Sequence, residues 1–140
     1  MNRALFASAT DEWATPADPY AALDAEFGFR DDPCPLVGHG NGLMREWQGP
    51  CFVNPPYSAI SVWMDKVALE VAAGKTIVVL LASRTDTRWW HRYAMQADEI
   101  RFLRRRLKFG NAKHPAPFPS VILVFRGKRP SRTVPSDCPS

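Results

Sequence analysis

Apolar residues along the chain follow two repeats, one typical of strands and one typical of helices. Short apolar runs bounded by Gly, Pro and charged residues predict strands, because a strand covered on both faces has little polar alternation. These runs lie at 27–34, 51–53, 76–81, 99–103 and 120–125. Apolar residues spaced three or four positions apart predict helices at 19–26, 58–73 and 87–97. The alternation of strands and helices predicts an α/β fold.

The strand predicted at 51–53 runs directly into Asn54, Pro55, Pro56 and Tyr57. Neither proline can donate a hydrogen bond to a neighbouring strand, so the strand must end at Asn54. The helix predicted at 58–73 follows at once. Asn54 is therefore expected at the carboxyl end of a strand, which is where open α/β sheets bind their ligands.

The residues of this turn suit chemistry on an exocyclic amine of a nucleobase. The lone pair of such an amine is delocalised into the ring, so the amine needs hydrogen-bond acceptors rather than a strong base. We expect the Asn54 side-chain oxygen and the Pro55 carbonyl each to accept one N–H. Tyr57 is expected to stack on the base, and the paired prolines to hold the acceptors in position beforehand.

The motif at 54–57 resembles the catalytic motif of amino-group methyltransferases that use S-adenosylmethionine and that methylate adenine N6, cytosine N4 or glutamine side chains. More of the chain resembles the phage-type DNA N6-adenine methyltransferases, the phage Dam-like family. The resemblance extends from about residue 11 to residue 126, in blocks that appear in a single order. The blocks are 11–16, 26–29, 42–43 with Trp47, 80–87, 89–91, 106–109 and 116–120.

The resemblance implies an abridged Rossmann-like sheet and transfer of a methyl group from S-adenosylmethionine to adenine N6 in DNA. It also implies a phage or prophage origin and a location in the cytoplasm of a bacterial host. Two other functions stay open, namely a DNA-associated protein that binds without turnover and a protein glutamine methyltransferase. Cytosine N4 is a close variant of the leading reaction, and the DNA recognition sequence is not predicted.

Residues near the amino terminus are the candidates for cofactor binding. By resemblance, Trp13, Thr15 and Pro16 line the cofactor pocket. Asp32 and Cys34, at the end of the strand predicted at 27–34, are further candidates, with Asp31 as the neighbouring alternative to Asp32. The glycine-rich loop that follows, at 37–42, has no clear G-x-G-x-x-G pattern, so the sequence itself gives little support for a cofactor loop.

Spacing predicts that the cofactor-binding half is shortened. About twenty residues separate the strand around Phe29 from the strand around Phe52, whereas one βαβ unit takes about thirty. Some of the usual strand–helix units must therefore be missing. We expect the adenosine end of the cofactor to be more exposed than usual, covered either by the N-terminal block or by a second subunit.

Candidate DNA contacts follow the second half of the sheet. Arg84 and Asp86 come after the strand predicted at 76–81 and are expected to share the crevice with Asn54. Trp89 and Trp90 lie about 100° apart on a helix, so one can pack in the core while the other faces the substrate. Arg106 and Lys108 belong to a strand predicted at 104–109 with one basic face, and are expected to reach a DNA phosphate or the base pocket.

Charge is unevenly distributed along the chain. Residues 1–80 contain ten Asp or Glu and five Lys or Arg, whereas residues 81–140 contain four and thirteen. Ten basic residues and no acidic one lie between Arg101 and Arg132. Such a run suits a surface that faces phosphates, although a merely solvated face is the alternative. Because the resemblance implies a DNA substrate, double-stranded DNA is the predicted partner.

Length and composition predict one methyltransferase domain at 11–126, with a loose leader at 1–10 and a basic, Pro- and Ser-rich tail at 127–140. The three cysteines, which include Cys51 and Cys138, have no C-x-x-C spacing, so neither a disulfide framework nor a metal site is predicted. No apolar run approaches the length of a membrane span. Both a monomer and a homodimer remain possible.

Overall fold

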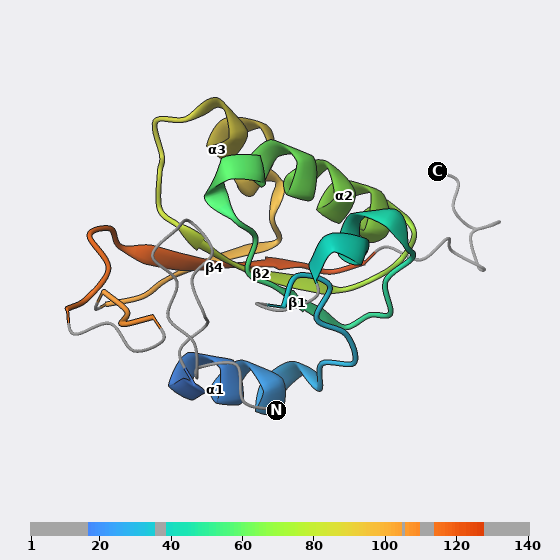
Figure 1. The fold of residues 1–140 in the computed structure, drawn as a ribbon, viewed down its shortest axis with the longest axis horizontal. Coiled ribbons are helices and arrows are strands. Elements are labelled where there is room, and N and C mark those ends of the chain that lie inside the picture. Colours follow the sequence, from blue (N-terminus) through green and yellow to red (C-terminus); the bar gives the residue numbers. More distant parts are fainter. Residues whose placement is uncertain (1–16, 36–38, 105, 110–113, 128–140) are drawn as a thin grey trace, which may run out of the picture.

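The structure is a computed structural model, and it describes residues 17–35, 39–104, 106–109 and 114–127 (Figure 1). Within these ranges the chain forms one four-stranded sheet covered by helices on both faces. No helix among the described residues is long and apolar enough to cross a bilayer.

The strands are β1 (Cys51–Val53), β2 (Ile77–Ala82), β3 (Glu99–Phe102) and β4 (Ser120–Phe125), and their order in the sheet is β1-β2-β4-β3. β1 is parallel to β2, while β4 is antiparallel to both β2 and β3. β1, β2 and β3 therefore point the same way, and β4 is inserted against them. We call the edge at which β1, β2 and β3 end and β4 begins the carboxyl edge, and the opposite one the amino edge.

Helices cover the two faces of the sheet unequally. α2 (Ile60–Ala72) and α3 (Arg88–Arg92) lie on one face, and α1 (Ala17–Phe27) lies on the other (Figure 1). Alternate residues of β2 separate into the two packing clusters, with Val79 on the α2 side and Leu80 on the α1 side. Every residue of β2 and β4 is buried, which explains why their sequences are continuously apolar.

Short 3-10 helices complete the described part of the chain: η2 (His39–Met44), η3 (Tyr57–Ala59) and η4 (Ala94–Gln96). In η2, Gly42 lies so close to Pro33 that a Cβ atom there would be 2.0 Å from the Pro33 carbonyl oxygen. Only glycine permits this approach. The glycine therefore lets the segment before η2 pack against η2 itself, and the Gly42 carbonyl accepts a 2.7 Å hydrogen bond from Trp47 Nε1.

Most predicted elements are confirmed within a few residues. The helix predicted at 19–26 is contained in α1, and the one at 58–73 corresponds to η3 followed by α2. The helix predicted at 87–97 is shorter and is divided into α3 and η4. The described part of the loop predicted at 37–42 belongs to η2 rather than to irregular chain.

The strand predicted at 27–34 is wrong. α1 continues to Phe27, and Gly28 then takes a φ of 66°, a conformation that ends helices. Asp24 holds this turn, because its Oδ1 accepts a 2.9 Å hydrogen bond from the Phe29 amide. Only Asp31 pairs with the sheet, in an isolated parallel bridge to Cys51.

The strand predicted at 104–109 is also wrong, because residues 104 and 106–109 belong to no strand. The alternation on which the prediction relied is nevertheless present. Leu107 and Phe109 pack against the α1-side cluster, while Arg106 and Lys108 are exposed. Packing of a loop onto the core produces the same pattern as a strand.

The expected shortening of a cofactor-binding sheet stays a prediction. In the described ranges the sheet has four strands, and only the Asp31 bridge extends it beyond β1. The covering of the cofactor's adenosine end remains a prediction.

Candidate active site

The turn that follows β1 lies at the carboxyl edge. Asn54 is half-buried at the end of β1, and Pro55 and Pro56 are buried beneath it. The Pro56 carbonyl accepts a 3.2 Å hydrogen bond from the Ala59 amide, which begins η3. Because β1 is parallel to β2, the residues after both strands lie at the same edge. The expected position of Asn54 is therefore confirmed.

Tyr57 connects the turn to the aromatic residues before β4. Its ring lies 5.5 Å from the ring of Phe118, in an edge-to-face arrangement with an interplanar angle of 78°. The Ser83 amide donates a 2.9 Å hydrogen bond to the Pro119 carbonyl, so the segment before β4 is held beside the end of β2. This pairing brings Phe118 to the turn, although more than sixty residues separate it from Tyr57 in the sequence.

Burial raises the pKa of Tyr57 above its ordinary value, and the positive charge of Arg84 and a backbone hydrogen bond at Ala82 oppose that rise only in part. The phenol is thus neutral at physiological pH. A tyrosine whose hydroxyl stays neutral is suited to stacking through its ring rather than to acid–base catalysis.

Arg84, Thr87 and Trp89 form the wall of the site that faces Tyr57. Together with Ser58 and Ile60 they line a cavity of about 610 Å³. Thr87 caps α3, because its Oγ1 accepts a 3.3 Å hydrogen bond from the Trp90 amide. Asp86 is not the cap; it is exposed and lines a neighbouring cavity, which shares Thr87 and Trp89 with the first.

The two adjacent tryptophans have separate environments, as expected. Trp90 is buried in the α2-side core with 2% of its surface exposed, so it is not placed to contact a substrate. Trp89 is only partly buried and lines both cavities. The candidate site therefore keeps Trp89 and not Trp90.

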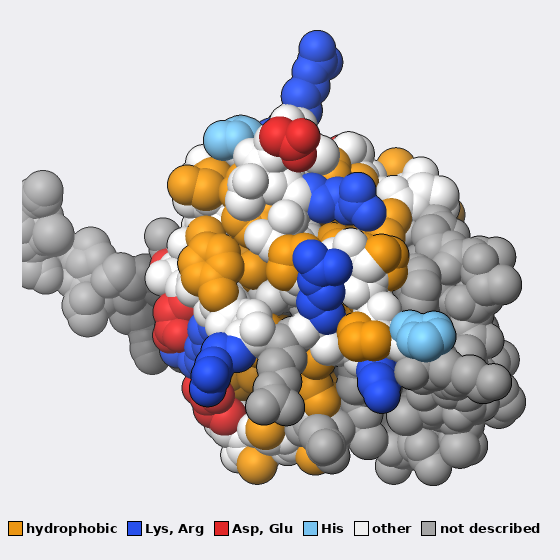
Figure 2. All heavy atoms as spheres, turned by 90° about the vertical axis from the view of Figure 1, so that its left-hand side faces the viewer, with side chains coloured by type: hydrophobic (Ala, Val, Ile, Leu, Met, Phe, Trp, Pro, Cys, Tyr) orange, Lys and Arg blue, Asp and Glu red, His pale blue; other side chains and the backbone are white. Residues whose placement is uncertain are grey.

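Arg106 and Lys108 are exposed on the loop between β3 and β4. The loop is attached to the protein near the site, because Phe109 lies 6.2 Å from Phe118 and the Leu107 carbonyl accepts a 2.7 Å hydrogen bond from the Ala116 amide. Figure 2 views the molecule from the side at which β2 ends and β4 begins, and Lys and Arg side chains lie across that face among hydrophobic ones. Both cations are thus on the loop that packs beside Tyr57 and Phe118.

Asp31 and Asp32, two neighbouring aspartates that precede β1 in the chain, were predicted near a cofactor. Burial alone would raise the pKa of Asp31, but hydrogen bonds from Arg45 and the Gln48 amide hold it below its ordinary value. Arg45 contacts both Asp31 carboxylate oxygens at 2.8 Å, so Asp31 is committed to a structural ion pair. Both carboxylate oxygens of Asp32 are shielded from solvent. The role of Asp32 as a cofactor contact stays a prediction.

Cys34 and Cys51 are both buried. Burial raises the pKa of the Cys51 thiol to about 12, so this side chain is no nucleophile. Trp13, Thr15, Pro16 and Cys138 lie outside the described residues. Among the described residues, no group of three or more His, Cys, Asp or Glu side chains is placed to hold a metal ion.

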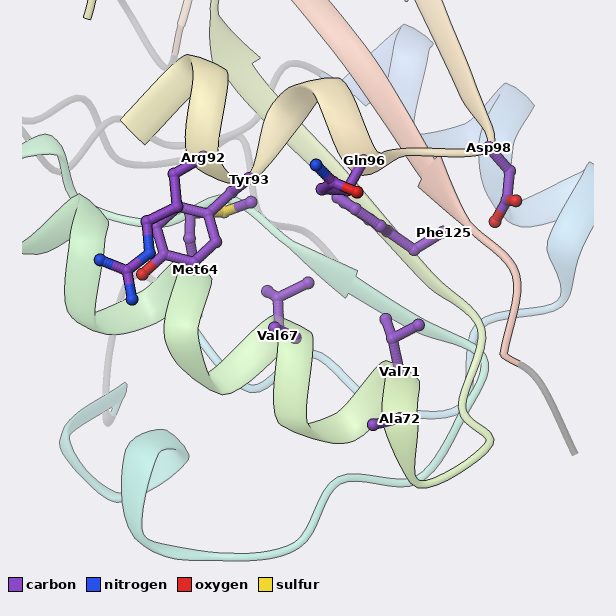
Figure 3. A pocket seen from close by; sticks show the side chains of 10 residues that line it. Met64, Val67, Val71, Ala72, Arg92, Tyr93, Gln96, Asp98 and Phe125 are labelled. Atoms are coloured by element: carbon purple, nitrogen blue, oxygen red, sulfur yellow. The ribbon is translucent and has the colours of Figure 1, made fainter. Parts of the chain in front are cut away.

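A separate cavity of about 380 Å³ lies between α2, η4 and the end of β4 (Figure 3). Its walls are apolar, with Val67, Val71 and Phe125 facing inward, and Arg92 and Asp98 stand at its margin. Because β4 ends at Phe125, this cavity lies toward the amino edge. It contains none of the predicted site residues.

Sequence reasoning missed Phe118 as a site residue. The block at 116–120 contained it, but nothing local indicates that it meets Tyr57. The contact follows from the pairing of Ala82 with Ser120 in the antiparallel β2–β4 ladder. Only the topology of the sheet reveals this neighbour.

The fold and site together define an α/β protein with amide and carbonyl acceptors beside an aromatic ring at the carboxyl edge of its sheet. One known family, described as DNA N-6-adenine-methyltransferase (Dam), matches residues 3–136 of the chain. The chain belongs to this family, and it is a DNA adenine N6-methyltransferase.

A curated relative supports the same assignment. The DNA N-6-adenine-methyltransferase of Haemophilus phage HP1 (strain HP1c1) is 28% identical over 140 residues, which cover 86% of this chain and 81% of the phage protein. No solved structure matches the chain. The resemblance drawn from the sequence is confirmed, as is the class of reaction.

Proposed function

We propose that the chain transfers a methyl group from S-adenosylmethionine to adenine N6 at the carboxyl edge, with Asn54 and Pro55 as acceptors and Tyr57 as the stacking ring. Family membership gives the reaction and requires a methyl donor. The position of the site is supported chiefly by one observation. Tyr57, the last residue of the turn at 54–57, lines a cavity together with Arg84 and Trp89.

The target adenine must leave the DNA helix to react, because its amine is paired and stacked inside a duplex. A cavity of about 610 Å³ falls in the range of small-ligand sites, roughly 300–1,000 Å³. Tyr57 supplies a ring for stacking, and Trp89 is a second aromatic wall. Both aromatic side chains favour a flat, extruded base over a flexible ligand.

Asn54 and Pro55 prepare the amine. The Asn54 side-chain oxygen and the Pro55 carbonyl each accept one N–H, which draws the nitrogen toward tetrahedral geometry and frees its lone pair. Pro56 is buried, so the turn is held rigid before the base arrives. The amine proton can leave to solvent after methyl transfer, so no dedicated base is required.

The residues near β1 fit the proposed methyl donor. S-adenosylmethionine, when bound, supplies a methyl group on a positively charged sulfur, which is electrophilic without a metal. The proposal assigns the Asp32 carboxylate to hydroxyl or ammonium donors of such a ligand. Cys34 lies two residues on, and the proposal assigns Trp13, Thr15 and Pro16 to the same pocket.

We also propose that the sheet is an abridged Rossmann-like methyltransferase sheet. Support comes from the three strands of common direction with β4 inserted antiparallel between β2 and β3. The catalytic turn follows a parallel strand, as in other ligand-binding α/β sheets. In this proposal the methyltransferase domain occupies 11–126.

DNA binding is proposed to involve Arg84, Asp86 and Trp89 at the cavity, and Arg106 and Lys108 on the β3–β4 loop. The arginines and Lys108 suit phosphates, while Asp86 suits a base amine at the second cavity. Such a substrate would place the protein in the cytoplasm of a bacterial host cell.

The proposal is tested by transfer of labelled methyl from S-adenosylmethionine to unmethylated DNA, with the product nucleosides identified by mass spectrometry. Asn54→Ala is expected to lower kcat by about 10²- to 10³-fold, while cofactor binding stays close to that of the wild type. Gln96→Ala removes an exposed carboxamide away from the carboxyl edge and is expected to change neither quantity.

Each contrary outcome has a clear meaning. N6-methyladenine from Asn54→Ala at the wild-type rate would place the acceptors elsewhere. Cofactor binding by the wild type without label in DNA would favour a protein that binds without turnover, and label in peptide would favour glutamine as the acceptor. N4-methylcytosine as the product would mean that the target base is cytosine, and the assignment of the turn at 54–57 would be kept.

A further inference from the structure

The Arg84 side chain lies across the two rings at the carboxyl edge. Its Cζ atom is 5.9 Å from the centre of the Tyr57 ring and 5.6 Å from that of Phe118. Because the two rings meet at 78°, they form a corner, which we call the aromatic corner. A base stacked on this side of the Tyr57 ring would need the space that the guanidinium occupies.

The backbone of Arg84 is fixed, whereas its side chain is exposed. The Arg84 amide donates to the Ala82 carbonyl at 3.0 Å, and the Arg84 carbonyl accepts from the Thr87 amide at 3.2 Å and from Thr87 Oγ1 at 2.8 Å. No ion pair to a carboxylate holds the guanidinium within the described ranges. The guanidinium can therefore leave by side-chain rotation alone.

Either the guanidinium or a stacked base can occupy the aromatic corner. The stronger of these two contacts with the ring decides which one does. A cation over an aromatic ring at an exposed site changes an equilibrium by about two- to fivefold. Stacking of a base on an aromatic side chain changes it by about five- to 150-fold. An extruded adenine is therefore able to displace the guanidinium, whereas the guanidinium covers the ring when DNA is absent.

We propose that Arg84 is a positioning residue that covers the stacking face of Tyr57 in the DNA-free enzyme and exchanges this contact for a DNA phosphate when the target adenine takes its place. The inference rests on the proposed stacking of that adenine on Tyr57. The base would then occupy the cavity of about 610 Å³ that Tyr57 and Arg84 both line, and the exposed Arg84 side chain has room to turn outward toward solvent. The phosphates that flank the base then supply the anion.

Two forms of one oligonucleotide separate the two contacts. A single strand that the wild type methylates carries 2-aminopurine at the target adenine. One form has natural phosphates, and the other has uncharged methylphosphonates at the linkages that flank the target. Equilibrium binding is measured with the full-length chain saturated with S-adenosylhomocysteine, so that no turnover occurs. The variants are Arg84→Ala and Arg84→Lys, and the control is Arg30→Ala.

Arg84→Ala is expected to bind the uncharged form about two- to fivefold more tightly than the wild type does, because the ring no longer has to be uncovered. For the natural form, Arg84→Ala is expected to make the slope of log K against the logarithm of the salt concentration less steep by about 0.9, as for one lost phosphate contact. Arg84→Lys is expected to keep the wild-type slope. Arg30 is exposed at the amino edge and should affect neither form.

Equal or weaker binding of the uncharged form by Arg84→Ala would overturn the covering role, because a merely structural arginine gives no gain in affinity. An unchanged salt slope would overturn the phosphate exchange. Tyr57→Ala identifies a different failure: if it binds both forms as tightly as the wild type, the proposed stacking itself is wrong. Thermal unfolding of each variant shows that the fold is retained.

Discussion

At the scale of single residues, Tyr57 combines two environments. Its ring lines the cavity at the carboxyl edge, while burial of the side chain keeps the pKa of its hydroxyl above the ordinary value. Phe118 fixes the orientation of the ring through its edge-to-face contact. We therefore expect the ring, rather than the hydroxyl, to be the part of Tyr57 that takes part in methyl transfer.

Substitutions at Tyr57 test this separation. Tyr57→Phe retains the ring and is expected to keep kcat/KM within a few-fold of the wild type. Tyr57→Ala removes stacking worth about 1–3 kcal/mol, so kcat/KM should fall by about five- to 150-fold. Both are measured as methyl transfer to DNA between pH 7 and 10.

The pH profile provides the control. Because the pKa of Tyr57 lies above its ordinary value of 10.0, its ionisation removes no activity in that range, and the wild type and Tyr57→Phe should give profiles of the same shape. A loss of activity in the wild type near pH 9 that Tyr57→Phe abolishes would show instead that the hydroxyl takes part in the reaction.

At the scale of elements, the sequence predicts a helix or strand correctly where only one kind of structure can produce its apolar pattern. The apolar run of β2 is continuous because both faces of the sheet are covered, and the prolines after Val53 end β1 locally. The segment 104–109 was mispredicted, because Leu107 and Phe109 alternate by packing a loop on the core. Phe29 was assigned to a strand, although it packs against Tyr20 and Phe52 after the end of α1.

Near the end of α2, Glu70 joins the helix to the turn before β2. The side chain is buried, and its two oxygens contact Lys66 Nζ at 2.7 Å and Lys75 Nζ at 2.8 Å. Burial alone would raise the pKa of Glu70, but the two lysines hold it below its ordinary value of 4.5. Glu70→Gln is expected to lower the free energy of unfolding by about 1–3 kcal/mol at pH 7, measured by urea denaturation.

The sign of the pH dependence follows from the lowered pKa of Glu70. The folded state favours the charged carboxylate, so its contribution is present above pH 4.5 and is lost as the pH falls below that value. The difference between the wild type and Glu70→Gln should therefore shrink from pH 7 to pH 3. Glu46→Gln is the matched control, because Glu46 is exposed and contacts the same Lys75 at 3.2 Å. A cost at Glu46 equal to that at Glu70 would contradict the argument.

At the scale of the whole molecule, the positive charges separate by location. Those with carboxylate partners lie away from the candidate site: Arg45, Lys66, Lys75, Arg101 and Arg126. Most cations without an ion pair in the described part of the chain lie at the carboxyl edge or on the β3–β4 loop, namely Arg84, Arg88, Arg104, Arg106 and Lys108, whereas Arg30 lies at the amino edge and Arg92 lines a cavity toward it. Positive charge without a carboxylate partner is thus concentrated where DNA is proposed to bind.

The sequence predicted this imbalance of charge and the turn that ends β1, because both are local in the chain; the catalytic role of the turn stays a prediction. It could not decide which of Trp89 and Trp90 reaches the cavity, since that depends on how α3 is rotated against α2. Nor could it bring Phe118 to Tyr57, because that contact requires the antiparallel pairing of β4 with β2. Long-range topology, rather than residue type, limits the prediction of the site.

The charge distribution leads to a last prediction, which concerns Arg106 and Lys108. Both are exposed beside the site, and each is expected to release about one counterion by contacting a phosphate. The double variant Arg106→Gln/Lys108→Gln should lower the slope of log K against log salt for duplex DNA by about 1.8. KM for DNA should rise while kcat changes little, because neither residue touches the reacting amine. Arg126→Gln is the control, since Arg126 is exposed but paired with Glu99 at the amino edge. A fall in kcat at unchanged salt slope would place the two cations in the base pocket instead of on the DNA backbone.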